Sequence, residues 1–476
     1  MTRLAAAALI AGFALPIGHL WAQEEPAAAE EAPAEEAAAG EEGGEAEADT
    51  IALPSATFGA LTLQPTLEAG TALFTQNSSW FGKSSANLGK NSDRWVEGYV
   101  TPGFGVTFDL GGAGRIDGAL NVVGALTHGT DAAGSNVDNE TPTDVALNQA
   151  WLGWNSGPLL TDSLGEDALD LSFGRQDFRL GSGFLFWTGS TNGGDRGAYW
   201  LAPRTAYQAA GIAKLETHGV TARAFYLEPD EDPDTDTKLA GVDVEYALEE
   251  GACALDAEVP NCLAIGYYNV FDSNIDTRDG MNVFDLRGDA RPFGAVPGVR
   301  LAGELAYEKN GDDLESYAWY GELGYAADDL PWSPYLSYRY AFFEGGESSS
   351  GKSKNFDPLF YDGPDWGTWT QGEIVGEWVL ANSNLISHTV RLNAYPTDQL
   401  TLTALYYYFR FDDAGAAGVD DNSFAHEVDF AVDYAVTGNL SVGVIAAVAV
   451  PMDGAKEYTG GAKTWGQLSA YATVAF

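Results

Sequence analysis

Cysteine, histidine and basic side chains are scarce in this 476-residue chain. It holds two cysteines, five histidines and 24 lysines and arginines against 69 acidic residues, which gives a formal net charge of −45. With so few bases, we expect no nucleic-acid partner. The isolated histidines form no His-Glu-x-x-His pattern, and neither a Gly-x-Ser-x-Gly elbow nor a phosphate-binding glycine loop occurs. The acidic run at 230–236 lacks the spacing of a calcium loop. The sequence therefore predicts no enzyme, no cofactor and no metal site.

Long hydrophobic runs are also lacking. Beyond the N-terminal region, no stretch reaches about 18 uncharged apolar residues, the length that a membrane-spanning helix requires. The apolar run Leu4–Leu15 follows Arg3 and leads to Leu20-Trp21-Ala22, an arrangement typical of a secretory signal. We therefore predict that residues 1–22 are a signal peptide, cleaved after about Ala22, and that the mature chain is exported.

Residues 23–54 consist almost entirely of Glu, Ala, Gly and Pro. Eleven acidic residues lie between Glu24 and Asp49. Such a composition cannot bury enough apolar surface to offset the entropy of ordering the chain. The stretch is predicted to be a disordered acidic segment in the periplasm.

The last fifty residues show the pattern that dominates the rest of the chain. Val428, Phe430 and Val432 alternate with Glu427 and Asp429, which is the period-two signature of a strand with one apolar and one polar side. A helix would spread these apolar residues around its whole circumference. Eighteen segments between residues 60 and 476 alternate in this way. The fold class predicted for residues 55–476 is all-β: an antiparallel β-barrel of about 18 strands.

Alternation alone does not decide what the apolar face contacts. Two possibilities are open: the interior of a secreted all-β protein, or the hydrocarbon of a lipid bilayer. An exported chain with 22 Tyr, 23 Phe, 13 Trp and 57 Gly is typical of a transmembrane barrel in a bacterial outer membrane. Short connections such as 397–398 alternate with long ones such as 344–383, as expected for inner turns and outer loops. We expect a monomer surrounded by outer-membrane lipid and lipopolysaccharide.

Cys253 and Cys262 lie nine positions apart with no histidine beside either of them. In an oxidising compartment this spacing favours a short-loop disulfide over a metal or redox site. The pair falls on a connection that the strand count places on the inner side of the membrane. A Cys253–Cys262 disulfide is therefore predicted.

The arginines of the barrel occur mainly on predicted strands. An arginine facing lipid would cost about 2–4 kcal/mol near the bilayer midplane, so most of these side chains should point into the lumen or lie at the interface. There they can meet inward acids such as Glu304 and Asp429. Two interpretations remain open: the arginines guide an anionic or hydroxyl-rich solute, or they pair with acids only to brace the wall.

Several short elements resemble the alginate export family of outer-membrane porins. The elements occur in order along residues 55–476, and they are Gly174-Arg175-Gln176, Phe356-Asp357-Pro358-Leu359-Phe360, Asn382-Ser383-Asn384-Leu385 and His426-Glu427-Val428-Asp429 with the terminal Phe476. The resemblance implies an 18-stranded barrel that passes a polyanion through a narrow, arginine-lined pore. It also implies pore-lining roles for Arg175, Arg179, Arg339 and Arg391.

This chain departs from such a channel in its charge, because acids exceed bases throughout the barrel. A polyuronate would then enter only where the constriction is locally positive. We therefore expect passive passage of anionic or hydroxyl-rich saccharides or small solutes, with the loop at 344–383 folding inward to narrow the lumen. The alternative is an adhesin or receptor barrel with a closed lumen and partner-binding outer loops. Conductance of the purified protein separates the two.

Overall fold

A computed structural model describes residues 51–83, 94–134, 141–247, 261–364 and 366–476 of the chain. The predicted signal peptide and most of the acidic segment lie outside these residues. The four described residues of that segment contact the barrel, since Asn439 donates a hydrogen bond to the carbonyl of Ile51 at 3.0 Å and Gln64 donates one to the carbonyl of Leu53 at 2.9 Å.

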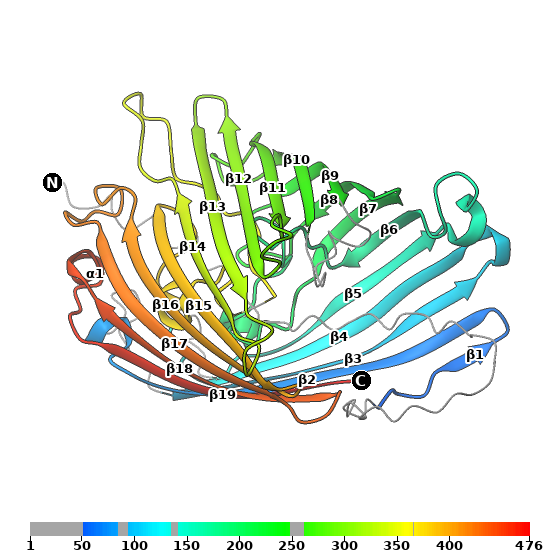
Figure 1. The fold of residues 1–476 in the computed structure, drawn as a ribbon, viewed down its shortest axis with the longest axis horizontal. Helices are drawn as coiled ribbons and strands as arrows, with labels where there is room; N and C mark the ends of the chain where they lie inside the picture. Colours follow the sequence, from blue (N-terminus) through cyan, green and yellow to red (C-terminus); the bar gives the residue numbers. More distant parts are fainter. Residues whose placement is uncertain (1–50, 84–93, 135–140, 248–260, 365) are drawn as a thin grey trace.

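Eighteen strands form one closed antiparallel sheet (Figure 1). In chain order they are β2 (Leu61–Asn77), β3 (Arg94–Asp109), β4 (Arg115–Gly129), β5 (Thr143–Asn155), β6 (Leu169–Gln176), β7 (Tyr207–Thr217), β8 (Val220–Glu228), β9 (Lys238–Ala247), β10 (Asn261–Asp272), β11 (Asn282–Ala290), β12 (Val299–Asn310), β13 (Leu314–Ala326), β14 (Tyr335–Phe343), β15 (Leu385–Thr397), β16 (Leu400–Phe411), β17 (Ser423–Ala435), β18 (Leu440–Pro451) and β19 (Trp465–Ala475). The barrel closes where β19 pairs with β2, with Ala470 opposite Leu73. The predicted all-β barrel of 18 strands is confirmed.

Shorter elements decorate the barrel. A three-residue strand, β1 (Ala56–Phe58), pairs with the start of β2. The helical turns are η1 (Ser79–Gly82), η2 (Gly111–Ala113), η3 (Gly157–Leu160), η4 (Gly194–Arg196), the π-helical η5 (Gly372–Gly376) and α1 (Asp453–Thr459). Within the described residues no helix is long and apolar enough to cross a lipid bilayer.

The two faces of the wall differ in polarity as the alternation predicts. On β17, Glu427 and Asp429 are buried in the lumen, whereas Val428 and Phe430 are 53% and 46% exposed on the outer face. Large apolar side chains are similarly exposed on most other strands, among them Leu73, Leu152, Phe173, Leu263, Leu286, Leu323, Leu336 and Leu468. A continuous apolar outer surface of this kind is unstable in water and fits the hydrocarbon core of a membrane.

The connections separate the two ends of the barrel. Residues 110–114, 218–219, 398–399 and 436–439 turn the chain at the end that carries the C-terminus, which lies beside β2 in Figure 1. The opposite end carries the longest connections, residues 177–206 and 344–384. By the usual asymmetry of such barrels, the short turns face the periplasm and the long loops begin on the outer side.

Both long loops fold into the lumen. Phe184 of the first loop and Trp369 of the second are fully buried, and their rings lie 4.7 Å apart in an edge-to-face contact. The inward fold of the loop at 344–383 was predicted, and its contacts with the wall confirm it. The loop at 177–206 also begins at the outer end and folds inward.

The predicted disulfide lies partly outside the described residues. Cys262 is the second residue of β10 and is half-buried. It lies opposite Ala247 of β9 and Asp289 of β11. Cys253 falls in the stretch 248–260, which the structure does not describe. The Cys253–Cys262 pairing stays a prediction.

Candidate functional site: the lumen constriction

The constriction is made by the two inward loops pairing with each other. The backbone N–H of Trp187 donates to the carbonyl of Phe360 at 2.8 Å, and the N–H of Phe360 donates to the carbonyl of Leu185 at 2.9 Å. A third bond runs from the N–H of Asp362 to the carbonyl of Gly183 at 3.0 Å. These bonds give the buried loop backbone the partners that it would otherwise lack away from water.

Gly183 allows the loops to approach this closely. Its φ is +82°, a conformation that side chains other than glycine rarely adopt. A Cβ at this position would lie 2.1 Å from the carbonyl oxygen of Asp362, which is backbone and cannot move aside. The contact between the loops therefore depends on glycine at this position.

Aromatic rings fix the paired loops to the wall. Phe184 packs between Tyr320 and Phe343, each with its ring centroid 5.6 Å away. Phe186 packs edge-to-face on Tyr268 of β10 at 4.9 Å. Each such contact adds roughly 0.5–1.5 kcal/mol beyond the burial of its area. The first loop is thereby held against β10, β13 and β14.

A second aromatic cluster fixes the loops to the other side of the barrel. The Trp200 ring lies 5.2 Å from Phe74 of β2 and 6.0 Å from Trp366 of the second loop. Tyr199 stacks on Trp378 at 5.2 Å. The two loops thus span the lumen from β10–β14 to β2 and β3.

Carboxylates of β17 bind the π-helical turn η5. Glu427 accepts hydrogen bonds from the N–H groups of Ile374 at 2.7 Å and Val375 at 2.8 Å, and Asp429 accepts one from the N–H of Glu373 at 3.2 Å. The first N–H groups of a helical turn have no partner within the turn, and anions are favoured there. Asp429, predicted to line the pore, therefore anchors a loop.

Two acidic residues lie buried beside Glu427 and Asp429: Glu373 of η5, and Glu377, which directly follows this turn. Burial, and next to it repulsion from Asp429, raises the pKa of Glu373 to about 8, although a hydrogen bond from Trp200 opposes the shift. Burial also raises the pKa of Glu377 well above its ordinary value, with repulsion from Glu373 as the next cause. Neither carboxylate oxygen of Glu377 has a hydrogen-bond partner among the described residues. This part of the lumen is acidic and weakly neutralised.

The opposite wall carries a network of paired charges. Arg287 of β11 bonds Asp243 at 2.8 Å, Glu245 at 2.6 Å and Asp285 at 2.7 Å. Arg223 of β8 shares the first two of these acids, at 3.1 and 3.0 Å. Glu304, predicted to line the pore, accepts a hydrogen bond of 3.5 Å from Ser182 of the first loop. Here the arginines brace the wall.

Arg278 is an anchor that the sequence did not reveal. Its guanidinium grips Asp357 of the second loop with two bonds of 2.7 Å and lies 5.7 Å from the ring of Phe360. A bidentate pair of this kind combines charge with fixed geometry. Asp357 and Phe360 both belong to the predicted element at 356–360, and that element could have pointed to a buried base as its partner.

The four arginines predicted to line the pore all lie near the constriction. Arg175 pairs with Asp230 and donates to the carbonyl of Asn148 at 2.8 Å. The guanidinium of Arg179 lies 4.8 Å from the ring of Trp187. Arg179 thus contacts the first loop, whereas Arg175 is held by β5 and by the connection that follows β8.

The other two predicted arginines lie beside the second loop. Arg339 stacks on Trp369 at 4.4 Å and donates to the carbonyl of Gly367 at 2.6 Å. Arg391 faces the lumen from β15 and is 8% exposed. Arg339 thus supports the second loop.

Charged side chains of both signs line the lumen. Bases on its face include Arg223, Arg287, Arg300, Arg339 and Arg391, on strands from β8 to β15. The first three of these pair with Asp243, Glu245, Asp285 and Asp289 of the same strands. Further acids on β3 and β17 are Glu97, Glu427, Asp429 and Asp433.

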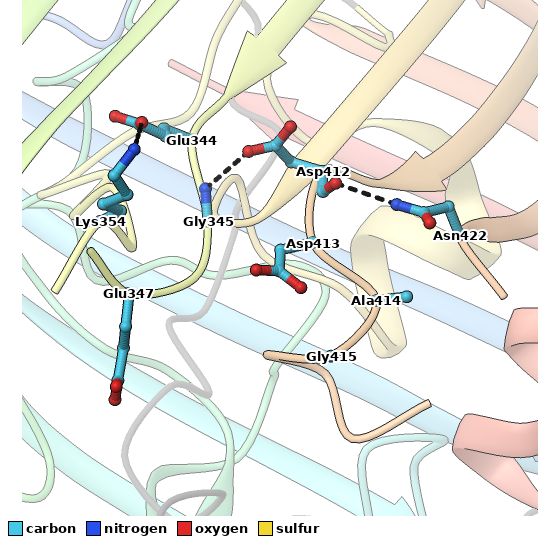
Figure 2. A pocket seen from close by; sticks show the side chains of 9 residues that line it. All are labelled: Glu344, Gly345, Glu347, Lys354, Asp412, Asp413, Ala414, Gly415 and Asn422. Atoms are coloured by element: carbon cyan, nitrogen blue, oxygen red, sulfur yellow. Dashed lines mark hydrogen bonds and ion pairs between the residues drawn. The ribbon is translucent and has the colours of Figure 1, made fainter. Parts of the chain in front are cut away.

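A polar cavity of about 370 Å³ lies at the outer end, next to the second loop (Figure 2). Glu344 bonds Lys354 at 2.9 Å, while the side chain of Asp412 accepts from the N–H of Gly345 at 3.1 Å. The remaining charged groups lining it are Glu347 and Asp413. Acids outnumber bases in this vestibule, yet no group of three or more acidic, His or Cys residues in the described part of the chain is arranged to hold a metal ion.

The closed sheet, its apolar outer surface and its asymmetric connections define the class of protein: an 18-stranded transmembrane β-barrel of the bacterial outer membrane. The fold is similar to solved barrels of Pseudomonas aeruginosa. OccK5 (OpdH) matches with a TM-score of 0.52 and 10% identity, OccK10 (OpdN) with 0.51 and 13%, and OccK9 (OpdG) with 0.51 and 12%. Each comparison covers 87% of this chain and 98% of the other.

The comparisons of sequence identify no family. No protein-family model matches the chain, and no curated protein matches it. At 10–13% identity, the solved structures establish the shared fold and leave the solute undetermined. The resemblance to the alginate export family therefore rests on the short elements alone.

Proposed function

We propose that this protein is an outer-membrane channel through which small hydrophilic solutes pass passively. The observation that carries the proposal is the charged lumen, in which arginines on β8–β15, most of them paired with acids of the same strands, and further acids on β3 and β17 surround two inward loops. If the lumen were only a closed core, apolar side chains would fill it at a lower free energy, because burying charges carries a large desolvation penalty. A charged lumen is useful where water and solutes enter it.

The chemistry of the bases favours anionic or hydroxyl-rich solutes, including saccharides. Guanidinium groups present planar forks that bind carboxylates and hydroxyls through paired hydrogen bonds. Two of these groups remain accessible to water towards the periplasmic end: the side chain of Arg300 is 38% exposed and that of Arg115 is 40% exposed. A solute in that half of the lumen can therefore reach a guanidinium without breaking the loops.

Alginate itself is a narrower proposal. The polyanion would have to pass the acidic vestibule around Asp412 and Asp413 and the acids of β17. Like charge raises the barrier to entry. Short uronates or neutral sugars meet a lower barrier than a long polyuronate, so we place them first among the solutes.

A closed barrel that acts as an adhesin or receptor is the second candidate. The observation that favours it is the complete burial of Phe184 and Trp369 at the centre of the lumen, which leaves the loops tightly packed. On this alternative the acidic vestibule would serve to bind a partner. The two functions differ in whether the two inward loops leave a path for solutes through the lumen.

Reconstitution into a planar bilayer and into liposomes distinguishes them. A channel should give discrete current steps and should swell liposomes in neutral sugars and in uronate oligomers. A matched variant with Arg391 and Arg300 replaced by Gln should slow the uptake of uronates more than that of neutral sugars. Absence of both current and uptake would reject the channel and leave the closed barrel.

A further inference from the structure

A row of alternating tyrosines and histidines runs across the outer face of four strands. Tyr340 of β14 lies opposite His388 of β15, His388 opposite Tyr408 of β16, and Tyr408 opposite His426 of β17. Successive rings lie 5.1, 5.7 and 5.1 Å apart. The residues that alternate with them, such as Ser387 and Glu427, are buried in the lumen, so the row faces outward. We call it the Tyr/His row.

Each histidine of the row is held by a further tyrosine. The hydroxyl of Tyr338 lies 2.8 Å from Nδ1 of His388, and the hydroxyl of Tyr406 lies 2.9 Å from Nδ1 of His426. When a hydroxyl donates to Nδ1, the ring proton lies on Nε2. The Nε2 atoms of both rings have no protein partner among the described residues. The row thus presents two N–H donors on the outer face.

Arg410 lies next to the row, at the outer end of β16. It is opposite Ile386 and two residues beyond Tyr408, so its side chain leaves from the same outer face. It forms no ion pair with a described residue. Asp421 is close enough for its charge to be attracted by Arg410, while its hydrogen bonds go to Ser423, including one from the Ser423 N–H at 2.7 Å.

The depth of the row places it at the outer membrane interface. On β16, Tyr408 is eight residues from Leu400, which lies opposite the outward Tyr434 near the periplasmic end. Eight residues span about 26 Å along a strand, or roughly 20 Å across the membrane at the usual tilt. The apolar band of such barrels is about 25 Å tall. Tyr434 therefore lies near the inner interface, and Arg410 lies at the level of the outer headgroups.

We propose that the Tyr/His row and Arg410 bind the phosphate of a phosphorylated glycolipid in the outer leaflet. The guanidinium of Arg410 pairs with the phosphate, and the Nε2–H group of His388 donates to one of its oxygens. The Nε2–H group of His426, on the other side of the Tyr408 ring, is left to donate to the sugar that bears the phosphate. The outward tyrosine rings supply flat apolar surface for the sugar that bears the phosphate. An arginine directed at lipid is costly unless an anion neutralises it, and the headgroup layer is where an anion occurs.

This proposal does not depend on transport, since it needs only the membrane orientation of the barrel. It differs from a plain aromatic girdle, which anchors a barrel at the interface without selecting any headgroup. The distinguishing prediction is dependence on phosphate. The full-length protein in neutral detergent should bind diphosphorylated lipid A more tightly than the same lipid after enzymatic dephosphorylation.

The test measures the rise in unfolding temperature as each lipid is added. For the native protein, we expect half-saturation at a concentration at least about tenfold lower with the phosphorylated lipid. In R410Q and in H388Q/H426Q this preference should fall to less than about threefold. The matched control is R94Q, which removes an exposed arginine at the outer end of β3, away from the row, and should retain the preference.

Three results would overturn the proposal. They are equal binding of the two lipids by the native protein, an undiminished preference in both row variants, and a preference lost equally in R94Q. Inorganic phosphate at the same concentration should produce no shift, and a shift as large as that of the lipid would assign the site to the free ion instead. If R410Q does not fold, R410K keeps the charge without the fork, and should weaken the preference partially.

Discussion

Glu427 of the barrel wall accepts a hydrogen bond from the backbone N–H of Ile374 at 2.7 Å, and this bond joins the second inward loop to β17. Both residues are buried, and the same carboxylate also receives the N–H of Val375. A loop that begins at Phe343 is thereby held deep within the lumen. In the channel that we propose, the stability of this docking would set how far the lumen is open.

Replacing Glu427 with Ala should release the loop. The variant leaves two buried N–H groups without acceptors, which costs about 1–3 kcal/mol for each unsatisfied group. We expect single-channel conductance to rise and the unfolding temperature to fall. D117A is the matched control, because Asp117 is an acid of β4 that bonds Arg115 and Thr107 and contacts neither loop. Equal conductance in E427A and the native protein would exclude Glu427 as an anchor.

Conductance should increase with pH. Glu373 has a pKa of about 8 in the docked loop because of burial, against 4.5 for an ordinary solvated glutamate. The docked state therefore binds the proton more tightly, so docking is strongest below about pH 4.5 and weakens as the pH rises to about 8. Glu377, whose pKa is also raised by burial, acts in the same direction. The loss amounts to a few kcal/mol at most.

The measurement for this pH dependence is channel open probability between pH 5 and pH 9. The groups that face Glu373 are Asp429, Asp433, Glu427 and Glu377, which repel it, and Trp200, which donates to it. E373Q removes the titrating group and should flatten the curve. A native profile that falls with rising pH would contradict the assigned sign.

The contact between the two loops should depend on Gly183. G183A places a Cβ against the carbonyl oxygen of Asp362 and also strains a backbone with a φ of +82°. G418A is the matched control, since its φ of +74° imposes similar backbone strain while the added Cβ meets nothing within 4 Å. We expect G183A to lower the unfolding temperature more than G418A and to raise conductance. Indistinguishable variants would show that the loops do not need close contact.

Arg391 should contribute to ion selectivity. Removing its positive charge from the lumen face of β15 lowers the local attraction for anions. In a salt gradient, R391A should move the reversal potential toward cation selectivity, and R175A/R391A should move it further. R410A is the control, because this arginine faces outward and should leave the reversal potential unchanged. A shift of equal size in R410A would point to a general surface-charge effect.

The strands were predictable because alternation is local. All eighteen predicted segments correspond to barrel strands. A period of two can be recognised from neighbouring residues alone, such as Val428 and Glu427. The exact ends of the strands were less predictable, and β6, which ends at Gln176, is an example. Gly174 has a φ of +133° and the pairing with β7 shifts its register before Gln176, so the chain leaves the wall there.

The partners of the site residues were not predictable from period or spacing. Arg175 pairs with Asp230, 55 positions away, and Arg278 pairs with Asp357, 79 positions away. Such pairs are set by how the loops fold inside the barrel, which strand patterns do not encode. Besides the element at 356–360, an available signal was the run Phe184-Leu185-Phe186-Trp187 in a glycine-rich loop, because four consecutive apolar residues tend to be buried.

The most direct test of the account is single-channel conductance of the native protein beside a variant in which residues 347–382 are replaced by a short Gly-Ser linker. The account predicts measurable current from the native barrel and a conductance several times larger once this loop is removed. No current from either protein, or the same conductance from both, would contradict a water-filled lumen that this loop constricts.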